Sequence, residues 1–303
     1  MKSITTLALL LVAGLSVLSI GCAKKDTEKM NDELKQFLTA FEAKYAPLGK
    51  EANLAAFDAS LSGKDEDYKK SGDLEIQRST MFSNKEDFAK LKKFRDSGAI
   101  TDPSLKRQLD ILYWAFQSRQ IDETKIAEII RMEKGVEKKF STFRAEVNGK
   151  VYSDNEIEDI LKKSTSSTEL EAAWTASKKV GESVSADVLA LVKMRNEAAR
   201  SLGFKNYHAM QLELSEQDPA MIETLFDELD ALTRDAFPSL KGDIDTYLAK
   251  RLNLPKEQLM PWHYQNRYFQ EAPKIYDVDL DAFYKDKDVV ALTTKYYAGI
   301  GLP

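Results

Sequence analysis

The chain has 303 residues, of which 49 are acidic and 44 basic, for a formal net charge of −5. This balance argues against a nucleic-acid-binding protein, which needs a basic face. The only cysteine is Cys22, which excludes a disulfide within the chain, and charges of both signs are interspersed as on a solvated helix surface.

Residues 1–21 have the organisation of a secretory signal peptide. Lys2 supplies the positive start, and residues 4–20 carry no charge. An uncleaved membrane anchor is the alternative, because an apolar run of this length is near the lower limit for crossing a bilayer. We predict a signal peptide, and hence an exported protein.

Cys22 directly follows this apolar run and the small residue Gly21. The arrangement resembles that of bacterial lipoproteins, in which the cysteine is acylated and becomes the first residue of the mature protein. We therefore predict lipidation at Cys22, a tether over residues 22–29, and a membrane lipoprotein facing the periplasm or the outside. Ser19 stands where such signals usually carry Leu, so an ordinary cleaved signal remains the alternative.

From Met30 onward, apolar residues recur at helical spacing. The first such helix is expected to end at Pro47 and Gly49. Its apolar face consists of Met30, Leu34, Phe37, Leu38, Phe41 and Tyr45. A second helix is expected to start at Asp102-Pro103, with Asp102 as N-cap. Its apolar face consists of Leu105, Leu109, Leu112, Tyr113 and Phe116.

Further helix starts follow the same logic. Residues 153–156 and 166–169 both read as capping boxes, Ser-x-x-Glu. Asp218-Pro219 starts another helix, whose apolar stripe is Ile222, Leu225, Phe226, Leu229 and Leu232. Residues 143–152, which contain Asn148-Gly149, predict either one small hairpin or a break between helices. The prediction is an all-α fold, with residues 30–303 as one helical domain.

The common catalytic motifs are absent from this sequence. The two histidines, His208 and His263, lie 55 residues apart and form no H-E-x-x-H zinc motif. No G-x-S-x-G elbow and no phosphate-binding glycine loop occur. Asp277, Asp279 and Asp281 lack the glycine and terminal Glu of a calcium loop, so they read as polar helix-start residues.

The segment from Pro261 to Pro273 combines four aromatic residues with polar and charged ones. Aromatic bodies with polar tips suit the wall of a ligand cleft. The predicted cleft-wall residues are Trp262, His263, Tyr264 and Gln270. A loop packed on the domain surface with its aromatics tucked in is the equal alternative.

Residues 191–207, LVKMRNEAARSLGFKNY, resemble the helix R-N-E-A-A-R-x-x-G-F of angiotensin-converting-enzyme-like zinc peptidases. Residues 51–58 with Ser62-Gly63 are similar to an early helix of bacterial members. Ala173-Trp174, residues 261–264 and residues 270–273 follow in the family's order. The resemblance covers residues 30–303. In physical terms, Ala198 and Ala199 permit close helix packing, and Gly203 is expected to end the helix.

The resemblance implies a two-lobed zincin-type helical fold around a cleft, with zinc held by H-E-x-x-H and a later Glu. It also implies that the substrates are peptides, from which C-terminal dipeptides are removed. The 303 residues contain no such motif, so no catalytic or metal residue is assigned and no zinc is expected in this chain. The expectation is therefore the N-terminal part of such a peptidase, as an incomplete or inactive copy. The alternative is a non-catalytic lipoprotein module that binds peptides or serves as a scaffold. The sequence leaves its status as an enzyme open.

Overall fold

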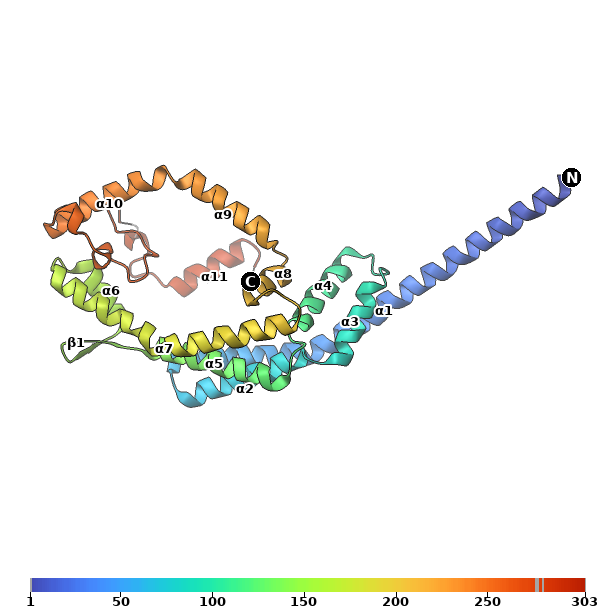
Figure 1. Cartoon of the computed structure of the whole chain (residues 1–303), viewed down its shortest axis with the longest axis horizontal. Coiled ribbons are helices and arrows are strands. Elements are labelled where there is room, and N and C mark those ends of the chain that lie inside the picture. The colour runs from blue at the N-terminus through green and yellow to red at the C-terminus, as the bar shows by residue number, and fades with distance from the viewer. Residues whose placement is uncertain (1, 276–277, 280, 303) are drawn as a thin grey trace. The chain divides into compact units, whose positions relative to one another are not determined.

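The computed structural model of the chain describes residues 2–275, 278–279 and 281–302, and side chains from Thr27 onward. The fold is all-α, as predicted, and the described strands form a single hairpin (Figure 1). In chain order the elements are α1 (Lys2–Ser62), α2 (Asp65–Met81), α3 (Lys85–Asp96), α4 (Pro103–Gln117), α5 (Glu123–Thr142), β1 (Ala145–Val147), β2 (Lys150–Tyr152), α6 (Asp154–Lys163), α7 (Ser167–Ser201), α8 (Tyr207–Leu214), α9 (Pro219–Thr233), α10 (Ala236–Leu252), η1 (Lys256–Gln258), η2 (Pro261–Tyr264), η3 (Asp281–Phe283) and α11 (Val289–Gly299).

The chain divides into two compact units. Unit 1 comprises residues 1–144 and 178–230, and unit 2 comprises residues 145–177 and 231–303. Unit 1 therefore holds α1 to α5, the second part of α7, and α8. Unit 2 holds the hairpin, α6, the first part of α7, α10 and the segments that follow it. The single domain expected over residues 30–303 stays a prediction.

The core of unit 1 joins the two apolar helix faces that the sequence predicted first. Leu34 of α1, and Leu105, Leu109 and Phe116 of α4, belong to one buried cluster. Phe41 lies 5.5 Å from Phe116, ring centre to ring centre. Helical spacing placed each set on one face, and burial of both faces holds α1 and α4 in the same core.

Pro47 does not end the first helix, contrary to the expectation. α1 continues through Pro47 to Ser62. A proline inside a helix removes one hydrogen bond to the carbonyl four residues earlier, here Ala43. The following turns nevertheless pack well: Ala52 and Ala55 are buried against Leu74 of α2. The buried contacts with α2 offset the lost hydrogen bond, so the helix continues.

Three of the predicted helix starts are confirmed by hydrogen bonds from the first turn to the capping side chain. The Asp102 carboxylate accepts from the Leu105 N–H at 2.8 Å. The Asp218 carboxylate likewise accepts from the Ala220 N–H at 2.8 Å. Before α6, Ser153 and Glu156 form the full reciprocal capping box. In each case one side chain satisfies a backbone donor that the first turn leaves free.

The second predicted capping box is only half formed. The Ser166 hydroxyl accepts from the Glu169 N–H at 3.4 Å, but the Glu169 carboxylate accepts from the Ser164 hydroxyl at 2.6 Å. Ser164 in turn accepts from the Ser166 N–H at 3.1 Å. Ser164 thus takes the place of the Glu169 side chain as the partner of the N-cap backbone.

The hairpin alternative for residues 143–152 is confirmed. β1 and β2 pair antiparallel, with Ala145 opposite Tyr152 and Val147 opposite Lys150. Asn148 and Gly149 have φ values of 52° and 79°. Two consecutive positive φ angles are what a tight hairpin turn requires, and Asn-Gly adopts them at low cost.

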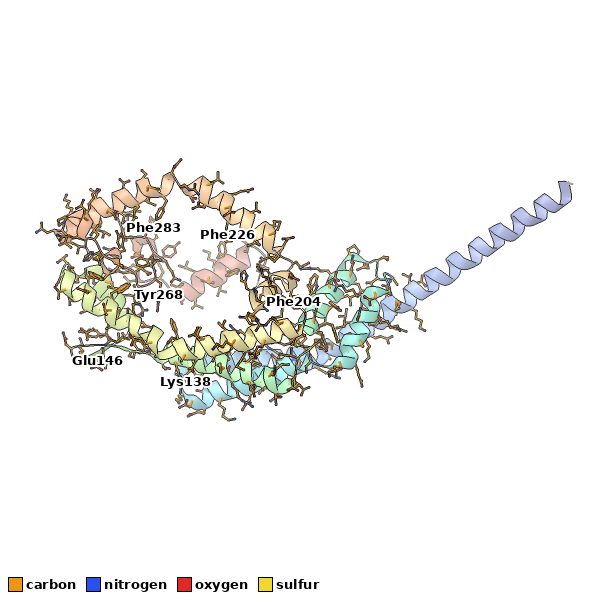
Figure 2. The ribbon with its side chains drawn as sticks, in the orientation of Figure 1. Lys138, Glu146, Phe204, Phe226, Tyr268 and Phe283 are labelled. Atoms are coloured by element: carbon orange, nitrogen blue, oxygen red, sulfur yellow. The ribbon has the colours of Figure 1, made fainter. Side chains whose placement is uncertain are left out.

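The helix predicted from the apolar stripe forms as α9, but the stripe is not buried. No residue of α9 is buried, and Phe226, labelled in Figure 2, is 65% exposed. The apolar residues of α11 are exposed as well, including Tyr296 at 64%. Helical periodicity predicts the helix, whereas burial of its face depends on a partner.

Candidate functional site

The candidate site is the segment 261–273 of unit 2. α10 ends at Leu252, and the left-handed backbone of its C-cap residue Asn253 (φ 52°) turns the chain toward η1 and η2. Asparagine tolerates this conformation better than most residues. Pro261 starts η2 with a preset φ. The aromatic segment is therefore held to α10 by a short, specified turn.

His263 is buried and bonded on both ring nitrogens. Its Nδ1 accepts from the Met260 N–H at 2.8 Å, and its Nε2 lies 2.9 Å from the Ser167 Oγ. Because Nδ1 is an acceptor, the neutral ring carries its proton on Nε2 and donates to Ser167. Burial lowers the pKa of His263, and the charge of Glu171 only partly opposes this. The ring is therefore a neutral link between η2 and the start of α7.

Trp262 lies beside the start of α7 as well. Its ring centre is 6.2 Å from that of Trp174, and the planes are inclined at 57°. Such tilted pairs are favourable contacts between aromatic rings. Two of the motifs behind the family resemblance, Ala173-Trp174 and residues 261–264, thus meet in space.

Tyr264 closes a polar triad with α10. Its hydroxyl donates to the Asp245 Oδ1 at 2.8 Å and accepts from the Lys241 Nζ at 2.7 Å. Lys241 also donates to both Asp245 oxygens, at 2.7 and 2.8 Å. Burial raises the pKa of Tyr264. Burial also pulls the pKa of Asp245 upward, but hydrogen bonds from Lys241 and Tyr264 outweigh it and the pKa is lowered. The triad thus joins a neutral phenol to an ion pair.

Arg267 fastens the middle of the segment to α6. Its Nε donates to Glu158 and its Nη1 to Asp154, both at 2.8 Å. The Arg267 side chain is only 15% exposed, so these are partly desolvated, charge-assisted bonds. Burial by itself lowers the pKa of Arg267. The hydrogen bonds and charges of Glu158 and Asp154 outweigh burial, so the pKa is raised. The segment thereby supplies a cation to carboxylates in the first two turns of α6.

Asn266 shapes the turn that leads to Gln270. Its side-chain oxygen accepts from the backbone N–H of Tyr268 at 2.9 Å and of Gln270 at 3.1 Å. Asn266 is 9% exposed, whereas the side chain of Gln270 is exposed. One buried amide thus organises the backbone of residues 266–270.

The four predicted cleft-wall residues therefore differ in their surroundings. His263 is buried, Trp262 and Tyr264 are half-buried, and Gln270 is exposed. Their assignment to a substrate cleft stays a prediction. Sequence analysis missed Lys241, Asp245 and Asn266. The only sequence signal for the first two is an i, i+4 charge pair, which looks like any surface ion pair on a helix.

The motif R-N-E-A-A-R lies in unit 1, and its polar residues make structural contacts. Arg195 donates from Nε and Nη2 to Glu133 of α5, at 3.1 and 2.6 Å. The Asn196 side chain accepts from the Tyr207 N–H at 2.9 Å, at the start of α8. Ala199 is fully buried. The motif therefore joins α7 to α5 and α8.

Gly203 ends this helix as predicted. It has a φ of 90°, and the following N–H of Phe204 donates to the Ala199 carbonyl at 3.1 Å. The Gly203 N–H donates to the Arg200 carbonyl at 3.0 Å. This pair of bonds is the Schellman arrangement, which satisfies carbonyls that the last turn leaves free. Phe204, labelled in Figure 2, follows the glycine and is half-buried.

Metal ligands do not converge within the described part of the chain. No group of three or more His, Cys, Asp or Glu is placed there to hold a metal ion. His263 uses both ring nitrogens, and His208 is exposed on α8. A catalytic zinc site needs three protein ligands. The described donor set therefore does not fit zinc.

Comparison with known proteins places the chain in a family. The sequence model described as angiotensin-converting enzyme matches residues 28–263, which is most of the chain. The chain belongs to this family of peptidases. The match includes the R-N-E-A-A-R helix of unit 1 and extends to His263 in unit 2. A search of curated proteins found no match. Among the described residues, no helix is sufficiently long and apolar to span a membrane.

Proposed function

We propose that this chain is the peptide-binding part of a zinc-dependent peptidase. The match to the angiotensin-converting enzyme family over residues 28–263 carries the proposal. Members of the family are zinc-dependent in general, and a peptidase acts on peptides. The segment 261–273 supports it, because half-buried Trp262 and Tyr264 are held in place by contacts with α7 and α10.

The chemical step needs ligands that these 303 residues do not supply. They contain two histidines and no H-E-x-x-H. His263 has no free ring nitrogen in this fold. In the family chemistry, zinc polarises the scissile carbonyl and activates water. We infer that these residues hold and orient a peptide, without cleaving it themselves.

A peptide-binding or scaffold lipoprotein without chemistry is the second candidate. The hydrogen bonds at both ring nitrogens of His263 favour this candidate, because a buried imidazole with two partners acts as a structural link. The first candidate and the peptide-binding form of the second both bind peptides, whereas a scaffold does not need to; the proposed anchor at Cys22 suits either candidate. They differ in whether zinc chemistry belongs to the protein at all.

Calorimetric titration of short peptides into the purified full chain, with and without a chelator, tests the proposal. We expect binding that the chelator leaves unchanged, and intact peptide by mass spectrometry afterwards. Trp262→Ala should weaken binding with little loss of helicity by circular dichroism. The matched control is Trp114→Ala, which changes a tryptophan of unit 1.

Two results would contradict the proposal. Absence of binding for every peptide tried would remove its basis. Chelator-sensitive cleavage by the purified chain would show that its own residues assemble a zinc site, against the donor set described above.

A further inference from the structure

Unit 1 contains a pocket of 300 Å³ whose walls come from two places in the chain. One wall is formed by α4 and the two residues that follow it, and the other by α8 and the two residues that follow it. The volume is at the lower end of the range of small-ligand pockets. At roughly 30 Å³ for each water-sized group, the pocket has room for about ten non-hydrogen atoms.

The walls of this pocket are largely aromatic and aliphatic. α4 contributes Ile111 and Trp114, and α8 contributes Tyr207 and Leu214. Trp114 and Tyr207 are both half-buried. The Arg195 guanidinium lies 5.0 Å from the centre of the Tyr207 ring, a contact that helps to fix the ring. Walls of this kind suit a flat, apolar ligand body.

The charged residues that line the pocket are Arg119 and Glu216. Glu216 forms an ion pair with Arg107 of α4, so its negative charge is balanced within the protein. Within the part of the chain that the structure describes, the half-buried Arg119 guanidinium has no ion pair and no side-chain hydrogen bond. Its N–H donors are therefore available to an acceptor on a ligand.

We propose that this pocket binds a small aromatic carboxylate, with its ring against Trp114 and Tyr207 and its carboxylate on Arg119. The planar guanidinium matches a carboxylate through two parallel N–H···O bonds. A carboxylate balances the single charge of Arg119, whereas a phosphate group carries a charge of about −1.5 to −2 at neutral pH and leaves part of it unpaired. Gln211 and Ser215 line the same pocket and supply polar partners for a substituent on the ring.

This inference goes beyond the proposed function and does not depend on it. The pocket lies in unit 1 and shares no lining residue with the segment 261–273. The last residue of a peptide can also join an aromatic ring to a carboxylate, but it carries an amide and further residues. Room for about ten non-hydrogen atoms favours the free aromatic acid.

Titration of the full chain with benzoate, followed by NMR signals of the ligand, tests the inference. Benzoate should bind about tenfold more tightly than benzamide, which keeps the ring but loses the charge. Acetate keeps the charge but loses the ring, and it should also bind about tenfold more weakly than benzoate. Because it binds the folded chain, benzoate should raise the temperature of thermal unfolding.

Three variants test the role of the guanidinium. Arg119→Gln should weaken benzoate binding about tenfold and leave benzamide binding unchanged, because it removes only the charge-assisted bonds. Arg119→Lys keeps the charge without the planar fork, so its effect on benzoate should be intermediate. The matched control, Arg131→Gln, changes an exposed arginine of α5 outside the pocket and should have no effect.

Two further variants test the walls. Ile111 is 51% exposed, so Ile111→Asp should preserve the fold, as circular dichroism can verify. The introduced carboxylate competes for Arg119 and should weaken benzoate more than benzamide. Trp114→Ala should weaken both ligands and leave peptide binding intact, the reverse of the pattern expected for Trp262→Ala.

Several results would overturn the inference. These are no binding of benzoate at millimolar concentration, acetate binding as tightly as benzoate, or unchanged benzoate binding in Arg119→Gln. Tighter binding of acetyl-phenylalanine than of benzoate would assign the pocket to a peptide end instead. Benzoate binding by a chain that binds no peptide would remove the proposed function and support this inference.

Discussion

Polar side chains between Met260 and Gln270 are largely used to hold that segment in place. His263 links it to Ser167, Tyr264 to α10, and Arg267 to α6. Each contact satisfies a group whose burial without a partner would be costly. The segment is thus positioned by its own polar residues, and its half-buried aromatic surfaces remain as the candidate contacts for a peptide.

The histidine gives this arrangement a measurable dependence on pH. Burial lowers the pKa of His263 below 6.5, its ordinary value. As the pH falls through that value, the unfolded chain takes up a proton that the folded chain does not. The contribution of His263 to stability is therefore intact above pH 6.5 and declines below it.

We expect His263→Gln to reduce this decline of the unfolding free energy in acid. The substitution should also cost about 1–3 kcal/mol at neutral pH, because buried hydrogen bonds change. Urea unfolding at several pH values measures both effects. His208→Gln is the matched control, since His208 is exposed. An equal change of slope in both variants would contradict the assignment.

At the scale of elements, α1 and α7 are long helices whose continuity and ends have different causes. α1 passes through Pro47 because Ala52 and Ala55 pack on α2. α7 ends near Gly203 because that residue adopts a φ of 90°. Packing therefore overrides a local stop signal in one helix, and local backbone conformation terminates the other.

Pro47→Ala should stabilise the protein. It restores a backbone donor to the Ala43 carbonyl and removes the ring clash, which is worth about 1–3 kcal/mol in a helix interior. Thermal unfolding measures the gain. Pro255→Ala, in the loop before η1, should instead be neutral or slightly destabilising. No gain at Pro47 would mean that the helix stops there, as the sequence alone predicts.

Gly181 within α7 and Gly203 just after its end should respond in opposite directions to alanine. Gly203→Ala places a side chain at positive φ and should cost about 1–2 kcal/mol. Gly181 lies inside the helix, where a Cβ would meet nothing within 4 Å, so Gly181→Ala should stabilise by about 0.5–1 kcal/mol. Denaturant titration of both variants checks the difference in sign. Equal effects would show that the helix end does not depend on Gly203.

At the scale of the whole molecule, two compact units carry different parts of the family's sequence pattern. The R-N-E-A-A-R helix lies in unit 1, and the aromatic segment 261–273 lies in unit 2. The Cys22 side chain lies outside the described side chains. Export and lipidation therefore remain proposals based on the sequence of residues 1–22.

Cys22→Ser tests the proposed anchor. The thiol is the group that an acyl chain would modify, and several acyl chains together hold a protein stably on a membrane. The variant should move to the soluble fraction and lose labelling by a fatty-acid analogue. Ser19→Leu, which leaves the thiol intact, should retain both. Membrane retention of Cys22→Ser without label would indicate an uncleaved helix instead.

The sequence by itself determined the all-α class, the family and most helix starts. Capping by Asp102, Ser153 and Asp218 acts over two or three residues, and Asn148-Gly149 specifies its own turn, so these features are local. The tertiary structure decided the rest. α1 passes Pro47 because α2 covers it, and His263 becomes a buried link because Ser167, 96 positions away, is brought to its ring. Such pairings depend on which surfaces meet after folding, and periodicity along the chain does not predict them.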